Sequence, residues 1–375
     1  MAPGVQAPKV QGADKDFMDV ALSLAARNLG DTWPNPTVGC VLVKDGHVIG
    51  RGWTGSGGRP HAETEALGRA GAAAKGATAY VTLEPCSHHG KTPPCADALV
   101  AAGIARAVVA TTDPDPRVNG RGIARLREAG IQVSESVGKT AADRLNAGFF
   151  LKVREGRPFF ALKTATSLDG RIALASGESR WITGERARRA VHALRARFDA
   201  ILVGSETALT DDPLLTCRLD GYAGRAKVRI VLDHRLRLAP GSELVKTARE
   251  IPTWVMTAEQ ATQSPRYGEL VAGGVDVIPL KDSSDHAGFA FAVGKALAER
   301  GITRVLIEGG GQVAAAFLRA NLIDEVAWFR GPSVIGGDGR ASIHPMGLMN
   351  LADMPRFHPR ESLKFGDDTL DILAR

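Results

Sequence analysis

The sequence has few aromatic residues and no long apolar run. Only 5% of its 375 residues are Phe, Trp or Tyr, and no basic run alternates with aromatic residues as a base-stacking surface requires. This argues against nucleic-acid binding, although a net charge of +6 alone suits nucleic acids and phosphorylated small molecules equally well. No apolar stretch reaches about 18 residues, the length that crosses a membrane. We therefore expect no membrane partner.

Cysteine is also scarce. Four cysteines are too few for a disulfide scaffold in a chain of this length. One of them, Cys40, lies in an apolar strand pattern and is predicted to be a small core residue. The first 12 residues have neither the apolar core nor the basic start of a signal peptide. These features predict a cytoplasmic protein.

The length of the chain favours two domains, because one hydrophobic core rarely serves 375 residues. Apolar periodicity predicts a helix over 16–29, and two strands over 38–43 and 48–53 form an antiparallel hairpin through Asp45-Gly46. Helices and strands then alternate, which indicates helices on a largely parallel sheet. The predicted helices are 61–70, 94–102, 122–129 and 141–153, and the strands are 77–83, 105–111 and 131–133.

The charged, Gly- and Pro-containing stretch 154–158 breaks the helical period and predicts a domain boundary. A second α/β pattern follows it. Its predicted strands are 159–166, 200–203, 228–232, 254–256, 275–280 and 304–307, and its helices are 185–196, 289–299 and 313–320. No internal repeat relates the two halves.

The strongest chemical signal is a group of four residues, His61, Glu63, Cys86 and Cys95. One His and two Cys supply three ligands for zinc and leave the fourth tetrahedral position open to water, as in catalytic sites. A water activated in this way attacks carbon at neutral pH. Glu63 is placed to take the proton of that water and deliver it to a leaving amine. Both ligand segments are predicted at strand-to-helix junctions on one edge of the sheet.

Other interpretations of this group remain open. His88 or His89 could complete a structural zinc site, or the two cysteines could form a redox pair. A zinc-stabilised assembly protein without catalysis and an RNA-editing deaminase are the rival functions. A structural site would not explain Glu63, and an editing enzyme would need the aromatic and basic surface that the sequence lacks.

The N-terminal half closely resembles the bifunctional deaminase/reductase family of riboflavin biosynthesis. The resemblance rests on Asn35-Pro36, on His61-Ala62-Glu63 and on the run from Thr82 to Cys95, whose Pro-Cys-Ser-His-x-Gly-x-Thr-Pro-Pro-Cys pattern is specific to that family. It implies that His61, Cys86 and Cys95 hold zinc and that Glu63 is the proton donor. Asn35 and His88 would line the pyrimidine pocket. Thr54 departs from the family, in which His is common at that position.

In the second half no Gly-x-Gly-x-x-Gly follows the first strand, so a standard dinucleotide fold is not indicated. Instead, Glu308-Gly309-Gly310-Gly311-Gln312 lies between a predicted strand and a predicted helix. Such glycines either let backbone amides approach a phosphate or form an ordinary loop. Five arginines crowd one predicted helix, mostly as a solvated face. Of all the arginines in this half, Arg195 and Arg218 are predicted phosphate partners.

The second half resembles the reductase domain of the same family, which has a dihydrofolate-reductase-like fold and uses NADPH. Residues 164–171, 177–183 and 211–213 carry the match, and the resemblance extends from about 17 to 337. By position it implies a set of NADPH contacts: Ala165, Trp181, Thr183, Thr207, Asp211, Gly310 and Gly311. It also implies a set of contacts with the phosphorylated sugar: Ser179, Arg195, Leu215, Arg218 and Glu308.

The resemblance implies an α/β protein with two domains. A cytidine-deaminase-like three-layer domain, the zinc-dependent pyrimidine deaminase, would span 14–153, and a dihydrofolate-reductase-like domain, the NADPH-dependent reductase, would span 158–370. The expected activity is hydrolytic deamination of 2,5-diamino-6-(5-phosphoribosylamino)pyrimidin-4-one. NADPH would then reduce the ribosyl group, giving 5-amino-6-(5-phosphoribitylamino)uracil. We expect a cytoplasmic homo-oligomer with Zn²⁺ and NADPH as cofactors, a phosphorylated pyrimidine as substrate, and neither nucleic acid nor membrane as partner.

Overall fold

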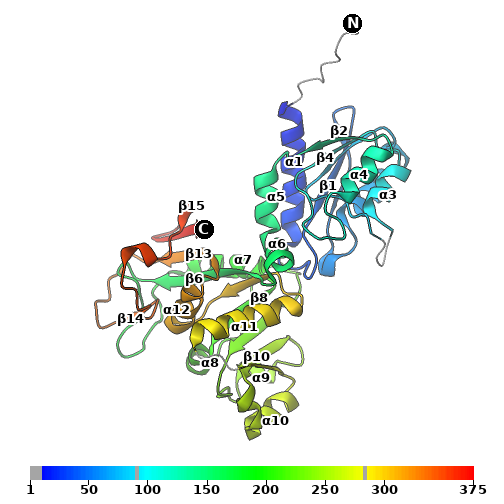
Figure 1. The fold of residues 1–375 in the computed structure, drawn as a ribbon. Helices are drawn as coiled ribbons and strands as arrows, with labels where there is room; N and C mark the ends of the chain where they lie inside the picture. The colour runs from blue at the N-terminus through cyan, green and yellow to red at the C-terminus, as the bar shows by residue number, and fades with distance from the viewer. Residues whose placement is uncertain (1–10, 89–92, 282–284) are drawn as a thin grey trace. The chain divides into compact units, whose positions relative to one another are not determined.

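The chain forms two compact units in the computed structural model, Met1–Arg154 and Glu155–Arg375. The structure describes residues 11–88, 93–281 and 285–375 (Figure 1). None of the described helices is both long and apolar enough to cross a membrane. Each unit is built on its own β-sheet.

The N-terminal unit is a three-layer sandwich. Its strands are β1 (Gly39–Lys44), β2 (His47–Trp53), β3 (Thr78–Val81), β4 (Arg106–Val109) and β5 (Gln132–Glu135). Its helices are α1 (Gln11–Ala25), α2 (Ala62–Ala70), α3 (Cys95–Ala101), α4 (Arg121–Glu128), α5 (Lys139–Leu145) and α6 (Ala147–Glu155). One buried cluster joins α1 and α5 to one face of the sheet. A second joins α2, α3 and α4 to the other face (Figure 1). The three-layer arrangement expected for this half is confirmed.

The five-stranded sheet has the order β2-β1-β3-β4-β5. The β1–β2 hairpin is antiparallel, as predicted, but β1 also pairs antiparallel with β3. Only the β3–β4 and β4–β5 pairs are parallel. The prediction of a largely parallel sheet is therefore wrong for half of this sheet. The prediction failed because the alternating pattern does not show which strand of the hairpin pairs with β3. Here β1 does, and it runs antiparallel to β3.

The predicted helix over 141–153 is two helices, α5 and α6, which meet at Asn146. The Asn146 side chain is buried and bridges the backbone of Thr37, accepting from its N–H at 2.9 Å and donating to its carbonyl at 3.0 Å. Asn146 has φ −97° and ψ 11°, outside helical geometry. The break is a tertiary contact across 109 residues, which helical periodicity does not reveal.

Helix α2 packs closely against β2, and this contact determines the position of the N-terminus of α2. A Cβ atom at Gly50 or Gly52 would overlap the backbone carbonyl of Ala66 or Ala62, respectively. Glycine removes that obstacle and lets the helix backbone approach the strand. The residues at the start of α2 are thereby held against the sheet.

The C-terminal unit contains a nine-stranded sheet in the order β11-β10-β9-β8-β12-β6-β13-β16-β15. Its strands are β6 (Phe159–Thr166), β8 (Ala200–Gly204), β9 (Val228–Leu232), β10 (Thr253–Ala258), β11 (Asp276–Leu280), β12 (Arg304–Ile307), β13 (Ile323–Arg330), β15 (His358–Phe365) and β16 (Asp368–Ala374). Two short strands, β7 (Arg171–Ala173) and β14 (Arg340–Ala341), pair separately. Its helices are α7 (Glu185–Ala196), α8 (Ser205–Asp211), α9 (Glu243–Lys246), α10 (Pro265–Ala272), α11 (His286–Glu299) and α12 (Gly311–Arg319).

The six strands predicted in this half are present, and their pairings with one another are all parallel. The C-terminal strands β13, β15 and β16 were not anticipated. Strand β13 joins β6 in parallel, and β16 and β15 then extend the sheet in antiparallel pairings. The side chains of β15 are almost all exposed, so the alternation that marks a half-buried strand is weak there.

Candidate functional site

Three predicted metal ligands come together in the N-terminal unit. The nearest ligand atoms of His61, Cys86 and Cys95 all lie within 4.8 Å of one another. The Nδ1 atom of His61 is 3.2 Å from Cys95 Sγ and 3.7 Å from Cys86 Sγ. His61 is the N-cap of α2 and Cys95 is the first residue of α3, so both stand at helix N-termini, as predicted. One nitrogen and two sulfur donors form the ligand set that zinc prefers, so these residues fit that metal.

The surroundings of Cys86 favour the thiolate form that a metal needs. A hydrogen bond with Cys95, together with one to His61, outweighs the opposing effect of burial and lowers the pKa of Cys86 to about 4. The backbone N–H of Cys95, at the start of α3, donates to Cys86 Sγ at 3.3 Å. The same contact with Cys86 raises the pKa of Cys95. A helix N-terminus thus stabilises negative charge on the sulfur, as the sequence predicted.

Glu63 lies in the first turn of α2 and is only 4% exposed. Burial, and then the charge of Cys86, raise its pKa to about 7. A carboxyl group with that pKa exchanges protons readily near neutral pH, as a general acid and base must. Glu63 follows the predicted ligand His61 by two residues, so a carboxyl group suited to proton transfer lies near the predicted metal centre.

The other predicted residues of this site differ in their surroundings. Asn35 Nδ2 donates to the Gly57 carbonyl at 3.2 Å. His88 is partly buried, and its Nδ1 has no hydrogen-bond partner. It does not belong to the His61, Cys86 and Cys95 group within the described residues, and His89 lies outside them. Thr54 is buried, and its hydroxyl accepts from the Val38 N–H at 2.9 Å, so it supports the backbone.

Cys40 is fully buried in the core between the sheet and helices α2 to α4, which confirms its predicted structural role. All four cysteines are free.

In the C-terminal unit Arg195 and Glu308 form a bidentate ion pair. Arg195 Nε and Nη2 donate to the two carboxylate oxygens of Glu308 at 2.6 and 3.0 Å, and Nη1 donates to the Thr216 carbonyl at 2.8 Å. Two residues predicted at the sugar site are thus brought together from α7 and the end of β12. The guanidinium is engaged, however, so Arg195 differs from the open phosphate partner expected from the sequence.

Lys163 was missed at the sequence level. Its Nζ lies 3.7 Å from Glu308 Oε2, so two cations face one buried carboxylate. Burial opposes ionisation of Glu308, but Arg195 and Lys163 outweigh it and hold its pKa at about 2. A charged residue within a predicted buried strand is the signal that could have identified Lys163. It lies in β6, most of whose side chains are buried.

The glycine-rich loop 309–311 begins α12, with Gly310 as its N-cap. A Cβ atom at Gly311 would contact His344 Cδ2 at 2.6 Å and the Ala341 carbonyl oxygen at 2.8 Å, so packing alone requires glycine there. At Gly310 the only atom within 4 Å would be Thr207 Oγ1, at 3.6 Å. Gly310 is thus not required by packing, and backbone N–H groups at a helix N-terminus are suited to binding a phosphate, so its predicted contact with NADPH stays a prediction.

The remaining predicted contacts of this unit lie on several elements. Trp181 is 68% exposed, and the Arg188 guanidinium lies 4.1 Å from its ring centroid. Leu215 is buried with φ +50°, and the Arg218 backbone donates to His192 Nδ1. The others are Ala165 in β6, exposed Ser179, partly buried Thr183 and Asp211 at the end of α8. Within the described part of the chain no hydrogen bond or ion pair joins these residues into one cluster, and their roles stay predictions.

Two family models match the chain. The RibD C-terminal domain matches residues 158–370. The cytidine and deoxycytidylate deaminase zinc-binding region matches residues 11–111. The chain is 44% identical to the riboflavin biosynthesis protein RibD of Escherichia coli, with 95% of this chain and 97% of the relative covered. It is 40% identical to RibD of Aquifex aeolicus, with 98% and 99% covered.

Solved structures agree. Acinetobacter baumannii RibD, form 2, matches with a TM-score of 0.86 and 37% identity, over 97% of this chain and 99% of that chain. The diaminohydroxyphosphoribosylaminopyrimidine deaminase/5-amino-6-(5-phosphoribosylamino)uracil reductase of Thermotoga maritima matches with a TM-score of 0.84 and 36% identity, over 97% and 99%. The predicted pairing of a deaminase fold with a reductase fold is confirmed.

Proposed function

Because the chain belongs to the RibD family of riboflavin biosynthesis proteins, we propose which of its residues carry each of the family's two activities. It is a bifunctional enzyme with a zinc-binding deaminase domain and an NADPH-dependent reductase domain. We assign residues 14–153 to the deaminase and 158–370 to the reductase. The division into compact units between Arg154 and Glu155 supports this assignment.

The first substrate is 2,5-diamino-6-(5-phosphoribosylamino)pyrimidin-4-one, and the first reaction replaces its ring amino group by oxygen from water. His61, Cys86 and Cys95 hold zinc, which supplies Lewis-acid activation of water when bound. Glu63 transfers one proton of the attacking water to the ring nitrogen and the second proton of that water to the departing ammonia. Asn35 and His88 line the pyrimidine pocket. The observation that carries this assignment is the approach of three ligand atoms to within 4.8 Å beside a buried carboxyl group.

The second reaction reduces the ribosyl group to ribityl, giving 5-amino-6-(5-phosphoribitylamino)uracil. When bound, NADPH would supply hydride to the anomeric carbon of the ribose, and a proton would go to the ring oxygen that is released as the ring opens. We assign the NADPH contacts to Ala165, Trp181, Thr183, Thr207, Asp211, Gly310 and Gly311.

We assign the sugar phosphate contacts to Ser179, Arg195, Leu215, Arg218 and Glu308. The ion pair with Arg195 keeps Glu308 charged and fixed in orientation, so its carboxylate accepts hydrogen bonds from the sugar hydroxyls.

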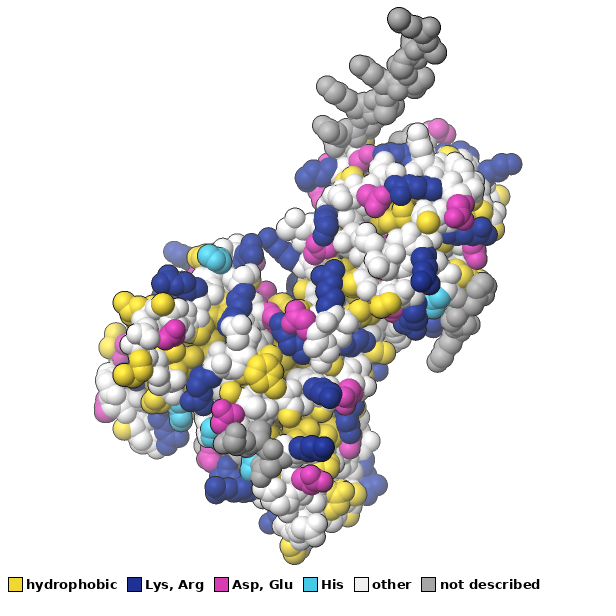
Figure 2. Space-filling model, viewed as in Figure 1, with side chains coloured by type: hydrophobic (Ala, Val, Ile, Leu, Met, Phe, Trp, Pro, Cys, Tyr) yellow, Lys and Arg dark blue, Asp and Glu magenta, His cyan; other side chains and the backbone are white. Residues whose placement is uncertain are grey.

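A phosphorylated small molecule suits the surface better than a nucleic acid. On the face in Figure 2, Lys and Arg side chains are scattered among other side chains and are not gathered into one basic patch. A backbone-tracking surface would need such a patch.

The chain is proposed to act in the cytoplasm as a homo-oligomer. Its four free cysteines suit a reducing compartment. The exposed strand β15, at one end of the nine-stranded sheet, offers an edge for a second copy.

The test supplies the purified zinc-loaded protein with the diaminopyrimidine phosphate and NADPH, and follows ammonia release and NADPH absorbance separately. We expect ammonia first and NADPH consumption after it. Ammonia without NADPH consumption would confine the function to the first domain. The absence of both signals would refute the assignment. Efficient deamination of a nucleic acid instead would favour an editing enzyme.

A further inference from the structure

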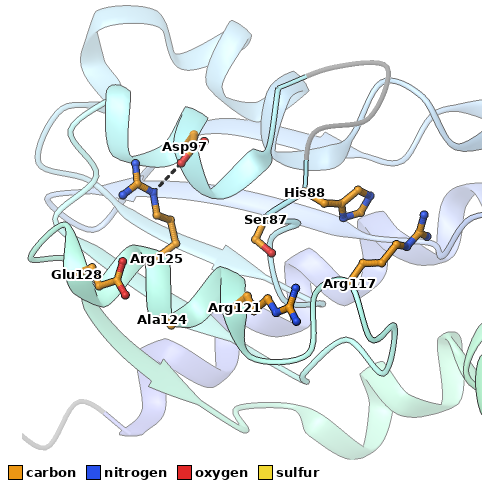
Figure 3. Close-up of a pocket in the computed structure, with 8 residues that line it drawn as sticks. All are labelled: Ser87, His88, Asp97, Arg117, Arg121, Ala124, Arg125 and Glu128. Atoms are coloured by element: carbon orange, nitrogen blue, oxygen red, sulfur yellow. Dashed lines mark hydrogen bonds and ion pairs between the residues drawn. The ribbon is translucent and has the colours of Figure 1, made fainter.

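A cavity of about 500 Å³ opens in the N-terminal unit between α3, α4 and the segment after Cys86 (Figure 3). Its main polar lining residues are Ser87, His88, Asp97, Arg117, Arg121 and Arg125. We propose that this cavity binds the phosphate group of the deaminase substrate and that Arg121 is its principal ligand. The proposal rests on the proposed deaminase function, because it places the phosphate end of that substrate.

The charges around the cavity single out Arg121. Arg125 pairs with Asp97 at 2.8 Å, and Arg117 pairs with Asp115 at 2.6 Å. The Arg121 side chain makes no hydrogen bond or ion pair with any residue that the structure describes. An open guanidinium presents planar paired donors that match the oxygens of a phosphate monoester.

The position of Arg121 within the cavity also favours an anion. In Figure 3 Asp97 and Glu128 lie with Arg125 toward one end, whereas Arg121, Ser87 and His88 lie away from them. The two carboxylates would repel a phosphate, so the end that holds Arg121 is the favourable one.

His88, which we assign to the pyrimidine pocket, also lines this cavity, so the cavity adjoins that pocket. The Nδ1 of His88 is buried without a hydrogen-bond partner, a state that costs free energy unless a bound group satisfies the nitrogen. His88 follows the proposed ligand Cys86 by two residues, and Asp97 follows Cys95 by two residues. The cavity is therefore lined by residues that directly follow both cysteine segments of the predicted metal centre.

A buried carboxylate holds this cavity in shape. Glu84 is 3% exposed and accepts backbone N–H bonds from Asp113 (3.2 Å), Gly120 (2.9 Å), Gly122 (2.8 Å) and Ile123 (3.2 Å). These bonds tie the start of α4 to the segment that leads into Cys86. They also occupy N–H groups at the α4 N-terminus, so the Arg121 side chain, and not the helix end, is left to bind an anion.

The close packing of Gly122 fixes Arg121 further. A Cβ atom at Gly122 would overlap the Pro85 carbonyl oxygen, so α4 lies directly against the residue before Cys86. Arg121 thus stands between two anchored residues. Because the backbone is anchored here, only the side chain of Arg121 has to become ordered when phosphate binds.

The first experiment compares Arg121→Ala with Arg127→Ala in the full zinc-loaded chain. Arg127 is the matched control, because it lies on the same helix but pairs with Glu135 and does not line the cavity. Ammonia release is measured with the phosphorylated substrate and with its dephosphorylated analogue. We expect Arg121→Ala to raise KM for the phosphorylated substrate about 10- to 100-fold, with kcat nearly unchanged. KM for the analogue should not change.

Two outcomes of this experiment would overturn the proposal. Equal changes in KM for the two substrates would show that Arg121 does not bind the phosphate group. An effect no larger than that of Arg127→Ala would show only the loss of a surface charge. Arg121→Lys should recover part of the affinity, since it keeps the charge but not the paired geometry.

A second experiment does not depend on catalysis. Ribose 5-phosphate is added to the full chain, and amide hydrogen exchange is measured over residues 113–123, with ribose as the control sugar. We expect ribose 5-phosphate to slow exchange in the wild type and in Arg127→Ala but not in Arg121→Ala. No slowing in the wild type would overturn the phosphate site. If the wild type released no ammonia, only the deaminase function would be refuted. The exchange result would still show whether the cavity binds a phosphate group.

Discussion

Two buried glutamates in the two units have opposite ionisation behaviour. Glu63 is buried beside the cysteines of the metal centre, and its pKa rises to about 7. The Glu308 side chain is only 7% exposed, but Arg195 and Lys163 hold its pKa at about 2. Burial alone favours the neutral carboxyl group in both cases, so the neighbouring charges decide the outcome. One site is suited to moving protons, and the other keeps a permanent anion.

The largest effect should follow from removing the proton-transfer group of the first unit. We expect Glu63→Gln to lower ammonia release about 10²- to 10⁴-fold, because it removes general acid and base catalysis and keeps the shape of the side chain. Zinc content, measured by atomic absorption, should stay at the wild-type level. NADPH oxidation with the deaminated substrate should stay within about twofold, as for independent sites. Loss of zinc together with activity would instead indicate a structural role for Glu63.

Glu308→Gln should affect the second unit in a different way. It removes one partner of a buried ion pair and leaves Arg195 without its counter-charge, which typically costs about 3–5 kcal/mol. We expect the free energy of unfolding of the C-terminal unit to fall by this amount and NADPH oxidation to fall with it. Urea unfolding measures the free energy of unfolding, and the absorbance of NADPH measures its oxidation. The matched control is Glu361→Gln, on the exposed strand β15. Unchanged stability would mean that the ion pair contributes nothing to the fold.

The low pKa of Glu308 also predicts a pH dependence of stability. Its ordinary pKa of 4.5 falls to about 2 in the folded chain, so the ionised group stabilises the fold above pH 4.5. That stabilisation, about 3 kcal/mol, should be lost as the pH falls from about 5 to about 2. Urea unfolding of the wild type and Glu308→Gln at several pH values tests this. Parallel pH profiles for the two proteins would contradict it.

The smallest effect concerns a long-range contact within the first unit. Asn146→Ala removes both hydrogen bonds to the Thr37 backbone and leaves a buried N–H and carbonyl unpaired, at a cost of about 1–3 kcal/mol. Thermal unfolding measures this loss, and Asn28→Ala, which removes a single bond to the Thr54 carbonyl, serves as the milder comparison. If Asn146→Ala lost no more stability than Asn28→Ala, the two hydrogen bonds of Asn146 would not contribute the stability predicted here.

The difference between the two units also explains how much the sequence could predict. His61, Cys86 and Cys95 span 34 residues in two short motifs at strand-to-helix junctions, so residue types and spacing were enough to group them. Arg195 and Glu308 lie 113 residues apart, and only the family resemblance placed them at one site. Their direct pairing, and the approach of Lys163, depend on the parallel order of β8, β12 and β6. Strands β13, β15 and β16 were missed because their side chains follow no simple alternation.

The sequence by itself was enough to predict the group His61, Cys86 and Cys95 that the structure brings together, the deaminase motif and the order of most helices and strands. It could do so because ligand chemistry and the periods of helix and strand are local properties of the chain. Only the tertiary structure decided that Glu308 is an anion paired with Arg195, that Asn146 interrupts a helix, and that the Arg121 side chain lines a cavity without an ion pair to any described residue. Each of these depends on charges and hydrogen-bond partners that are distant in sequence, and folding alone brings such partners together.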